Sequence, residues 1–388
     1  MAYCKFQADQ IFTGHRLLDH SHILITDPKG TVIDITTAEA GDDVRRYPGI
    51  LIPGQINCHC HLELSHLRNR IPEGQGLPTF IQGVMQTPMV EQEEKNRQMD
   101  LAEDEMYQNG IVGIGDISNH SYSIGSKLKS KIRWHHFLEI TNPDDEKAKS
   151  RVAQFRQMEA AFAQAFSPGS AISLSPHAIY SVSPQTLSLI NTHTKNKIIS
   201  IHNQECADED EWCRNGSGGF IRFYESIGRK NVPVPVSGKQ SVQTWLPYFN
   251  NGQTILLVHN TFMQEEDIVF AQTYALQNGL RLVYCFCPNA NLYIEKTLPQ
   301  VDLFIKHQCD IVIGTDSYAS NHQLSITGEM AALHKHFPQI PVTVLLQWAT
   351  LNGAKALRWD RDMGSFDKGK RPGIVLLESN LSKSTRII

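Results

Sequence analysis

Strand-like apolar runs recur eight times between residues 50 and 316, and this repetition limits the folds open to the chain. The runs are Ile50 to Ile56, Ile111 to Asp116, Ile132 to Ile140, Ala171 to Ser175, Ile198 to His202, Thr254 to His259, Leu280 to Cys285 and Cys309 to Asp316. Helical patterns such as 91–109, 147–166 and 265–278 separate several of them. Repeated strand-then-helix units predict an α/β fold with a parallel sheet, and eight units predict closure into a (β/α)8 TIM-like barrel. An open, doubly wound sheet is the competing architecture.

The two ends of the chain have a different character. Residues 22–26 and 31–35 are alternating, β-branched runs joined by Asp27-Pro28-Lys29-Gly30, which predicts a hairpin. Near the other end, turn residues at 369–373 precede an apolar run at 374–378. Chain termini often lie close together. We therefore expect residues 1–50 and 364–388 to form one small β-domain, a β-sandwich, and residues 51–363 to form the barrel.

Residues that can bind a metal fall where the predicted strands end. They are His59, His61, His202, His259 and Asp316. Because side chains alternate along a strand, the first two histidines share one face, whereas Cys58 and Cys60 point to the other and are expected to pack. The carboxyl ends of barrel strands meet at one face, where the active site lies. Imidazoles and a carboxylate suit Zn2+ or Fe2+, so the sequence predicts a metal site there.

These residues belong to an ordered series of motifs that resembles the amidohydrolase superfamily. The series is Pro53-Gly54-Gln55-Ile56-Asn57-Cys58-His59-Cys60-His61, Ser175-Pro176-His177-Ala178, His202-Asn203-Gln204-Glu205, His259-Asn260-Thr261, Cys287-Pro288-Asn289-Ala290-Asn291 and Gly314-Thr315-Asp316-Ser317. The resemblance runs from about residue 50 to residue 377 and is closest to the cytosine deaminase, chlorohydrolase and aminodeoxyfutalosine deaminase group. The segment His61-Leu62-Glu63-Leu64-Ser65 is similar to the aminodeoxyfutalosine deaminases. Cys60, Ile179 and Ala290 depart from the usual motifs, and the last two leave the substrate open.

The resemblance implies a set of site residues. The implied ligands of one divalent metal ion are His59, His61, His202 and Asp316. The implied catalytic groups are Glu205 as proton shuttle, His259 as the partner of the attacking water, and Asp316 as acceptor of that water's proton. The expected substrate contacts are His177, Glu63, Asn291 and Ser317. Zn2+ is favoured over Fe2+. Two-metal members of the superfamily carry a modified lysine where this chain has Pro176-His177, so one metal is expected.

Some of these residues have a simpler interpretation. An acidic run at 208–211 follows Glu205, so this side chain can also be a solvated loop carboxylate. His259 can be a further metal ligand or a packing residue, and His177 can be structural.

The leading functional hypothesis is hydrolytic deamination of an aminated purine-like or pyrimidine-like ring or nucleoside, with release of ammonia. One alternative is hydrolysis of another bond by the same mononuclear site, such as a cyclic amide or a carbon–halogen bond. A second alternative is a non-catalytic metal-binding barrel. The complete ligand set argues against the latter. A proton shuttle at Glu205 favours deamination, because such a group serves a ring nitrogen best.

The composition limits which classes of binding partner and which cellular compartment are expected. The net charge is −4, with 36 Lys and Arg against 40 Asp and Glu, so nucleic acid and anionic membranes are not expected as partners. No stretch approaches the roughly 18 apolar residues of a spanning helix. The eight cysteines are scattered, and the first residues lack a secretory pattern, which favours reduced thiols in a cytoplasmic protein. A small-molecule substrate and a homodimer are expected.

Overall fold

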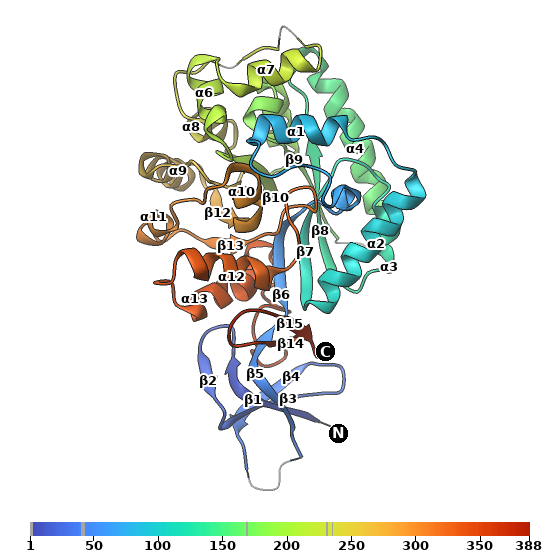
Figure 1. The fold of residues 1–388 in the computed structure, drawn as a ribbon, viewed down its shortest axis with the longest axis vertical. Coiled ribbons are helices and arrows are strands. Elements are labelled where there is room, and N and C mark those ends of the chain that lie inside the picture. Colours follow the sequence, from blue (N-terminus) through green and yellow to red (C-terminus); the bar gives the residue numbers. More distant parts are fainter. Residues whose placement is uncertain (1–2, 40–42, 168–169, 230–231, 235) are drawn as a thin grey trace.

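The computed structural model describes residues 3–39, 43–167, 170–229, 232–234 and 236–388. The fold is mixed α/β, as predicted, with a β-rich part at one end where both chain termini lie (Figure 1). Within the described ranges, none of the helices is both long enough and apolar enough to span a membrane.

Eight parallel strands form the centre of the larger part. They are β6 (Gln55–Cys60), β7 (Ile111–Ser118), β8 (Arg133–Ile140), β9 (Ala171–Pro176), β10 (Ile198–Asn203), β11 (Thr254–His259), β12 (Arg281–Phe286) and β13 (Ile311–Ile313). They pair in two four-stranded sheets, β6-β7-β8-β9 and β10-β11-β12-β13. Every residue of β6, β7, β10 and β11 is buried, as expected of parallel strands covered on both faces.

The two sheets meet at both of their edges. At one junction, the backbone N–H of His202 on β10 donates to the carbonyl oxygen of His177, which directly follows β9, at 2.9 Å. At the other junction, the N–H groups of Thr315 and Asp316 donate to the carbonyl oxygen of His59 at 3.0 and 3.1 Å. These bonds bring the ends of β6, β10 and β13 together, and with them the residues expected to bind metal.

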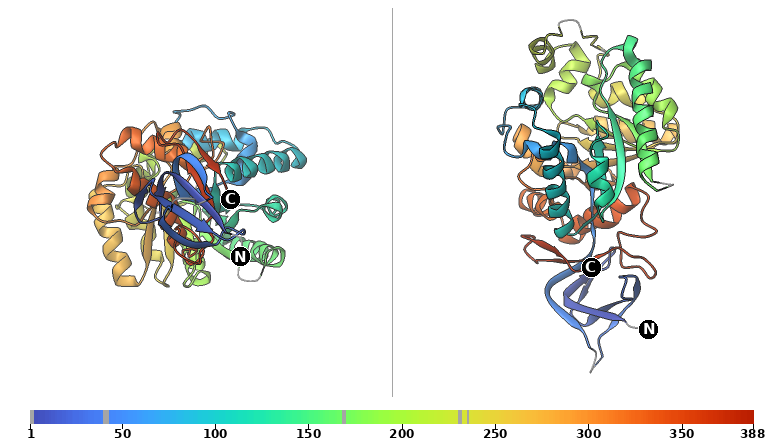
Figure 2. Two further views of the ribbon diagram at one scale, coloured as in Figure 1. Left: turned by 90° about the horizontal axis from the view of Figure 1, so that it is seen from below. Right: turned by 90° about the vertical axis from the view of Figure 1, so that its right-hand side faces the viewer.

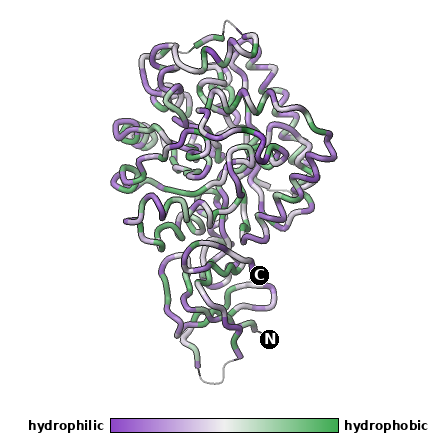
Figure 3. Tube along the Cα trace, in the orientation of Figure 1, coloured by the Kyte–Doolittle hydropathy of each residue, from purple (hydrophilic) through white to green (hydrophobic). Residues whose placement is uncertain are grey.

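Helices surround the parallel strands. They are α1 (Leu77–Gln86), α2 (Gln92–Gln108), α3 (Ile124–Lys129), α4 (Ala148–Ala165), α5 (Pro184–His193), α6 (Ala207–Asn215), α7 (Gly219–Ser226), α8 (Ser241–Trp245), α9 (Glu265–Asn278), α10 (Pro288–Glu295), α11 (Val301–Lys306), α12 (Ile326–His336), α13 (Val342–Gln347) and α14 (Gly353–Ala356). Hydrophilic and hydrophobic residues alternate along the outer helices (Figure 3), as expected of helices that pack by one face. The helix α9 begins at a capping box formed by Gln264 and Asp267.

The two ends of the chain meet in one seven-stranded sheet. Its members are β1 (Cys4–Phe12), β2 (Leu17–Asp19), β3 (His22–Thr26), β4 (Val32–Thr37), β5 (Arg45–Pro53), β14 (Ile374–Leu377) and β15 (Ser384–Arg386). The order is β15-β14-β5-β1-β3-β4, with β2 paired to β1. The predicted hairpin is confirmed as β3–β4. Figure 2 shows this sheet projecting from the end of the larger part.

The first predicted strand differs from the observed structure. The run Ile50 to Ile56 is divided at Gly54 between β5 of the terminal sheet and β6 of the parallel sheet. The N–H of Gly54 donates to the carbonyl oxygen of Pro372, and a Cβ at this position would lie 2.3 Å from a methyl carbon of Val112. The close approach requires glycine. One continuous apolar run therefore supplies two strands in different sheets.

Candidate active site

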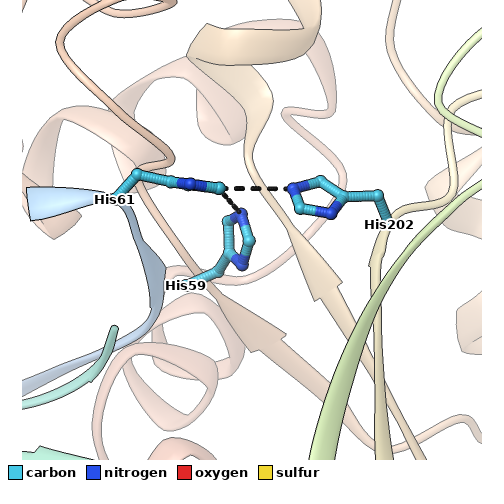
Figure 4. Close-up of side chains that lie close together, drawn as sticks. All are labelled: His59, His61 and His202. Atoms are coloured by element: carbon cyan, nitrogen blue, oxygen red, sulfur yellow. Dashed lines mark hydrogen bonds between the residues drawn. The ribbon is translucent and has the colours of Figure 1, made fainter. Parts of the chain in front are cut away.

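Three histidine side chains converge at the carboxyl ends of β6 and β10. The Nε2 atom of His61 lies 3.1 Å from Nε2 of His59 and 3.3 Å from Nε2 of His202. Figure 4 shows the three rings pointing toward one another. All three residues are buried. His59 and His61 face the same side because they are two residues apart at the end of a strand, as predicted.

Asp316 completes a set of four groups. Its Oδ1 atom lies 3.4 Å from Nε2 of His61 and 3.7 Å from Nε2 of His59. Its other oxygen, Oδ2, accepts a hydrogen bond of 2.5 Å from Ser320 Oγ. The carboxylate is therefore held from behind, and Oδ1 faces the imidazoles. The φ angle of Asp316 is 58°, a left-handed conformation that is uncommon for aspartate and concentrates at functional sites.

The geometry of this group fits one divalent metal ion. Nitrogen ligands about 2.0–2.1 Å from a four- or five-coordinate zinc ion lie about 2.9–3.6 Å from one another, a range that includes the observed separations of 3.1 and 3.3 Å. Burial lowers the pKa of His59 and His61 to about 4, so both imidazoles are neutral and have a lone pair to offer. Converging lone pairs repel one another unless a cation lies between them. The residues present therefore suit a metal cofactor.

A carboxylate that sequence reasoning missed orients the third histidine. Glu139, on β8, places Oε1 3.3 Å from Nδ1 of His202, which also lies 3.1 Å from the carbonyl oxygen of His177. This contact assigns the proton of His202 to Nδ1 and leaves Nε2 free for a ligand. Despite burial, Glu139 raises the pKa of His202 to about 9, so a metal at Nε2 competes with a proton. The one sequence feature that could have indicated Glu139 is its position near the end of a predicted strand.

A second missed feature is a buried ion pair next to the carboxyl end of β6. Asp116 Oδ2 lies 2.6 Å from Lys127 Nζ, and both side chains are inaccessible to solvent. Asp116 Oδ1 accepts a hydrogen bond of 2.8 Å from the N–H of Leu62. The pair therefore fixes the backbone directly after His61. Asp116 ends a predicted strand, but nothing in the sequence connects it with Lys127.

Glu205 and His259 form a second pair beside the histidine cluster. Glu205 Oε1 lies 3.5 Å from Nε2 of His259, whose Nδ1 lies 2.7 Å from Oδ1 of Asn291. Nε2 of His259 has no hydrogen-bond partner among the described residues. Only 4% of the surface of Glu205 is exposed, and burial raises the pKa of its carboxyl group well above the usual range. The alternative of a solvated loop carboxylate is therefore wrong.

The acidic run after Glu205 is itself partly buried and holds the Glu205 backbone. Glu209 accepts hydrogen bonds from the N–H groups of Gln204 and Glu205 at 2.9 and 3.2 Å, and one from the hydroxyl of Ser241. Burial raises the pKa of Glu209 to about 7. Asp210 accepts a hydrogen bond from the side chain of Gln204 at 3.1 Å. These bonds fix the turn after β10.

The residues expected to contact substrate occupy different environments. Glu63 accepts hydrogen bonds from the N–H groups of Asn119 and His120 and from the Ser123 hydroxyl, all between 3.1 and 3.3 Å, so its carboxylate holds the loop after β7. Ser317 is buried, and its hydroxyl accepts a bond from the N–H of Ala319.

The other two expected contacts lie against histidines of the site. His177 places its ring 4.8 Å from that of His202, with its Nδ1 2.6 Å from the Ser181 hydroxyl. The Oδ1 atom of Asn291 lies at hydrogen-bond distance, 2.7 Å, from Nδ1 of His259. The structure thus brings His177 and Asn291 beside the cluster, whereas the carboxylate of Glu63 is engaged by a neighbouring loop.

Residues 50–387 match the model of the amidohydrolase family. The chain belongs to this family. This amidohydrolase is 24% identical over 375 residues to the adenosine deaminase of Helicobacter pylori, covering 92% of this chain and 88% of the relative. It is 24% identical over 328 residues to the aminodeoxyfutalosine deaminase of a Nitratiruptor species, covering 81% and 76%. The family and the group named from the sequence motifs are thereby confirmed.

A crystal structure of the Helicobacter pylori aminofutalosine deaminase, in complex with methylthio-coformycin, has the same fold as this amidohydrolase. The TM-score is 0.78 at 20% sequence identity, and the match covers 97% of this chain and 92% of the other. The shared fold extends through both the parallel strands and the terminal sheet.

Proposed function

We propose that this amidohydrolase is a metal-dependent hydrolytic deaminase that releases ammonia from an aminated, nucleoside-like substrate. The observation that carries the proposal is the position of the Glu205–His259 pair, beside four converging groups that suit a metal. The names of the relatives, adenosine deaminase and aminodeoxyfutalosine deaminase, support an aminated purine-like ring as the reacting part of the substrate.

The proposed ligands are His59, His61, His202 and Asp316, and Zn2+ is the proposed metal, with Fe2+ as the alternative. Three nitrogens and one carboxylate oxygen are typical zinc ligands. When bound, such an ion acts as a Lewis acid and makes a hydroxide equivalent available near neutral pH. Glu139 supports this assignment by holding His202 in the tautomer that a metal requires.

The proposed proton transfers use groups of this chain. Asp316 Oδ1 accepts the proton of the attacking water, because Oδ2 is already engaged by Ser320. Glu205, whose raised pKa favours the protonated form, donates its proton to a ring nitrogen of the substrate and recovers one from the new hydroxyl group. The proton accepted by Asp316 passes to the amino group, which leaves as ammonia when the carbon–nitrogen bond breaks. His259 hydrogen-bonds the attacking water through Nε2, while Asn291 fixes its ring through Nδ1.

The proposed architecture is a closed (β/α)8 barrel formed by residues 51–363, with residues 1–50 and 364–388 as a separate β-sandwich domain. Hydrogen bonds at both junctions of the two parallel sheets support closure. Pairing of β14 with β5 supports the assignment of both chain ends to one domain.

We also propose a cytoplasmic homodimer that binds neither nucleic acid nor membranes. A mass of 43.7 kDa in light scattering would contradict the dimer.

A substrate screen tests the proposed activity. Ammonia release is measured with adenosine, methylthioadenosine, aminodeoxyfutalosine, guanine and cytosine, using protein of known metal content. Turnover of at least one of these is expected and must disappear after chelation and return with added Zn2+. Hydrolysis of a halogenated triazine or a cyclic amide without any ammonia release would identify the alternative chemistry. If metal-loaded protein turns over none of these compounds, the proposed enzymatic activity is contradicted.

A further inference from the structure

A cavity of about 410 Å3 lies at the opposite end of the parallel strands from the histidine cluster. It is bounded by Val112 near the start of β7, Arg133 at the start of β8, the turn before β4, and residues 371–373 and 386 of the C-terminal segment. Figure 1 shows this junction, where the terminal sheet meets the beginnings of the parallel strands. The volume of the cavity is within the range of about 300–1,000 Å3 that is usual for small-molecule sites.

The cavity has an unusual charge. Five of its twelve lining residues are basic, and none is Asp or Glu: Lys29, Lys131, Arg133, Arg371 and Arg386. The chain as a whole has more acidic than basic residues, 40 against 36. Arg133 pairs with Asp362 at 3.0 Å. Within the described part of the chain, no side-chain carboxylate forms an ion pair with Lys29, Arg371 or Arg386. The hydrogen bond from the N–H of Thr31, and to a lesser extent the charge of Arg371, lower the pKa of the nearby Asp27.

Arg386 is the least exposed of the five. Its guanidinium carbon lies 4.1 Å from the centre of the Tyr107 ring, and Lys131 Nζ lies 5.4 Å from the same centre. Neither Nε nor Nη1 of Arg386 meets a hydrogen-bond acceptor in the described residues. Burial lowers the pKa of this guanidinium, and the side chain of Tyr107 opposes that shift. A partly buried, unpaired cation beside other cations is unfavourable, and a bound anion would offset that cost.

We propose that this cavity binds a small phosphorylated molecule, with its phosphate among Lys29, Arg371 and Arg386. A phosphate monoester carries close to two negative charges at neutral pH, which matches several unpaired cations. Guanidinium groups form paired, charge-assisted hydrogen bonds with phosphate oxygens. The site is separate from the metal site, because it lies at the other end of the strands. It therefore stands independently of the proposed deaminase activity.

Isothermal titration calorimetry on the full, metal-loaded protein tests this site. The probes are orthophosphate, pyrophosphate and ribose 5-phosphate, with citrate as a carboxylate of similar charge, at an ionic strength of about 50 mM. Saturable binding of at least one phosphate compound at one site per chain is expected. Stronger binding of ribose 5-phosphate than of orthophosphate identifies an organic phosphate as the ligand, and the reverse identifies the inorganic ion.

Paired variants locate the binding. In Lys29→Gln/Arg371→Gln, both side chains are exposed, and loss of their contacts is expected to weaken phosphate binding about tenfold or more. The matched control is Arg97→Gln, an exposed arginine paired with Glu94 on the helix that also carries Tyr107. It should leave the affinity unchanged. The variant His59→Ala/His61→Ala must retain binding, which separates this cavity from the metal site.

Three results would overturn the proposal. One is absence of saturable binding by every phosphate probe up to about 10 mM, a limit corresponding to negligible affinity. Another is phosphate binding that survives Lys29→Gln/Arg371→Gln, whether or not it disappears in His59→Ala/His61→Ala, because the phosphate then lies outside this cavity. The third is binding of citrate as tight as that of the best phosphate probe, since this excludes a site built for a small phosphate ester.

Discussion

Glu139 Oε1 lies 3.3 Å from Nδ1 of His202, while Nε2 of the same ring lies 3.3 Å from His61. One imidazole therefore has a carboxylate at one nitrogen and the proposed metal position at the other. Carboxylates in this arrangement fix the tautomer and increase the basicity of the ligand nitrogen. The relationship gives Glu139 a positioning role that can be separated from direct ligation.

Glu139→Gln is expected to weaken metal binding by about 10- to 100-fold, the usual cost of losing such a partner. The amide has a similar shape but no charge, so the ring of His202 keeps its place and loses basicity. Metal affinity is measured by competition with a chromogenic chelator. The control is Glu146→Gln, an exposed glutamate before α4. An unchanged affinity in Glu139→Gln would remove the positioning role.

His59→Ala/His61→Ala is expected to abolish stoichiometric metal binding while leaving the fold intact. The wild-type protein should contain about one divalent ion per chain, since the four groups surround one position. Elemental analysis gives the metal content, and far-UV circular dichroism reports the fold. Two ions per chain in the wild type, or none after gentle purification, would contradict the proposed mononuclear site.

Glu205→Gln is expected to keep the metal but lower kcat by about 100- to 10,000-fold, equal to about 3–5 kcal/mol of barrier. Gln has nearly the same shape, but it cannot exchange a proton at neutral pH. kcat is measured with any substrate found by ammonia release, together with metal content. A loss below about threefold at full metal would exclude the shuttle role. Simultaneous loss of the metal would instead place Glu205 among the ligands.

Glu209→Gln tests whether the carboxylate that accepts the Glu205 N–H controls the position of Glu205. An amide nitrogen would face one of the backbone donors, so kcat should fall by about tenfold, equal to a positional cost of about 1–2 kcal/mol. Little change in KM is expected. The control is Glu211→Gln, exposed and two residues away on α6. Equal kcat values in both variants would show that the turn keeps its geometry without Glu209.

Lys127→Met should lower the free energy of unfolding by about 3–5 kcal/mol, because it leaves Asp116 as an unpaired buried charge. The matched control is Lys129→Met on the same helix, whose exposed contact with Asp100 at 3.3 Å is worth about 0–1 kcal/mol. Urea unfolding followed by circular dichroism measures both. A loss below about 1 kcal/mol in Lys127→Met would show that the pair contributes no more than a surface contact.

The local pattern of the sequence predicts much of this protein. The apolar runs lie on or beside the eight parallel strands, and the period of two at His59 and His61 places both side chains on one face. The pattern fails at Gly54, where one run is shared by two sheets. Hydrophobicity alone cannot show that break, because both halves of the run are buried.

The sequence by itself determined which residues end the strands, and therefore which imidazoles and carboxylates reach the same edge. Only the tertiary structure decided which groups support them. Glu139 contacts His202, which is 63 positions later in the sequence. Glu209 is buried, although it belongs to an acidic run whose sequence is typical of a solvated loop. Lys127 likewise meets Asp116 in the interior. Strand periodicity is a local property of the chain, whereas a buried charge is tolerated only where distant residues fold around it to supply its partners.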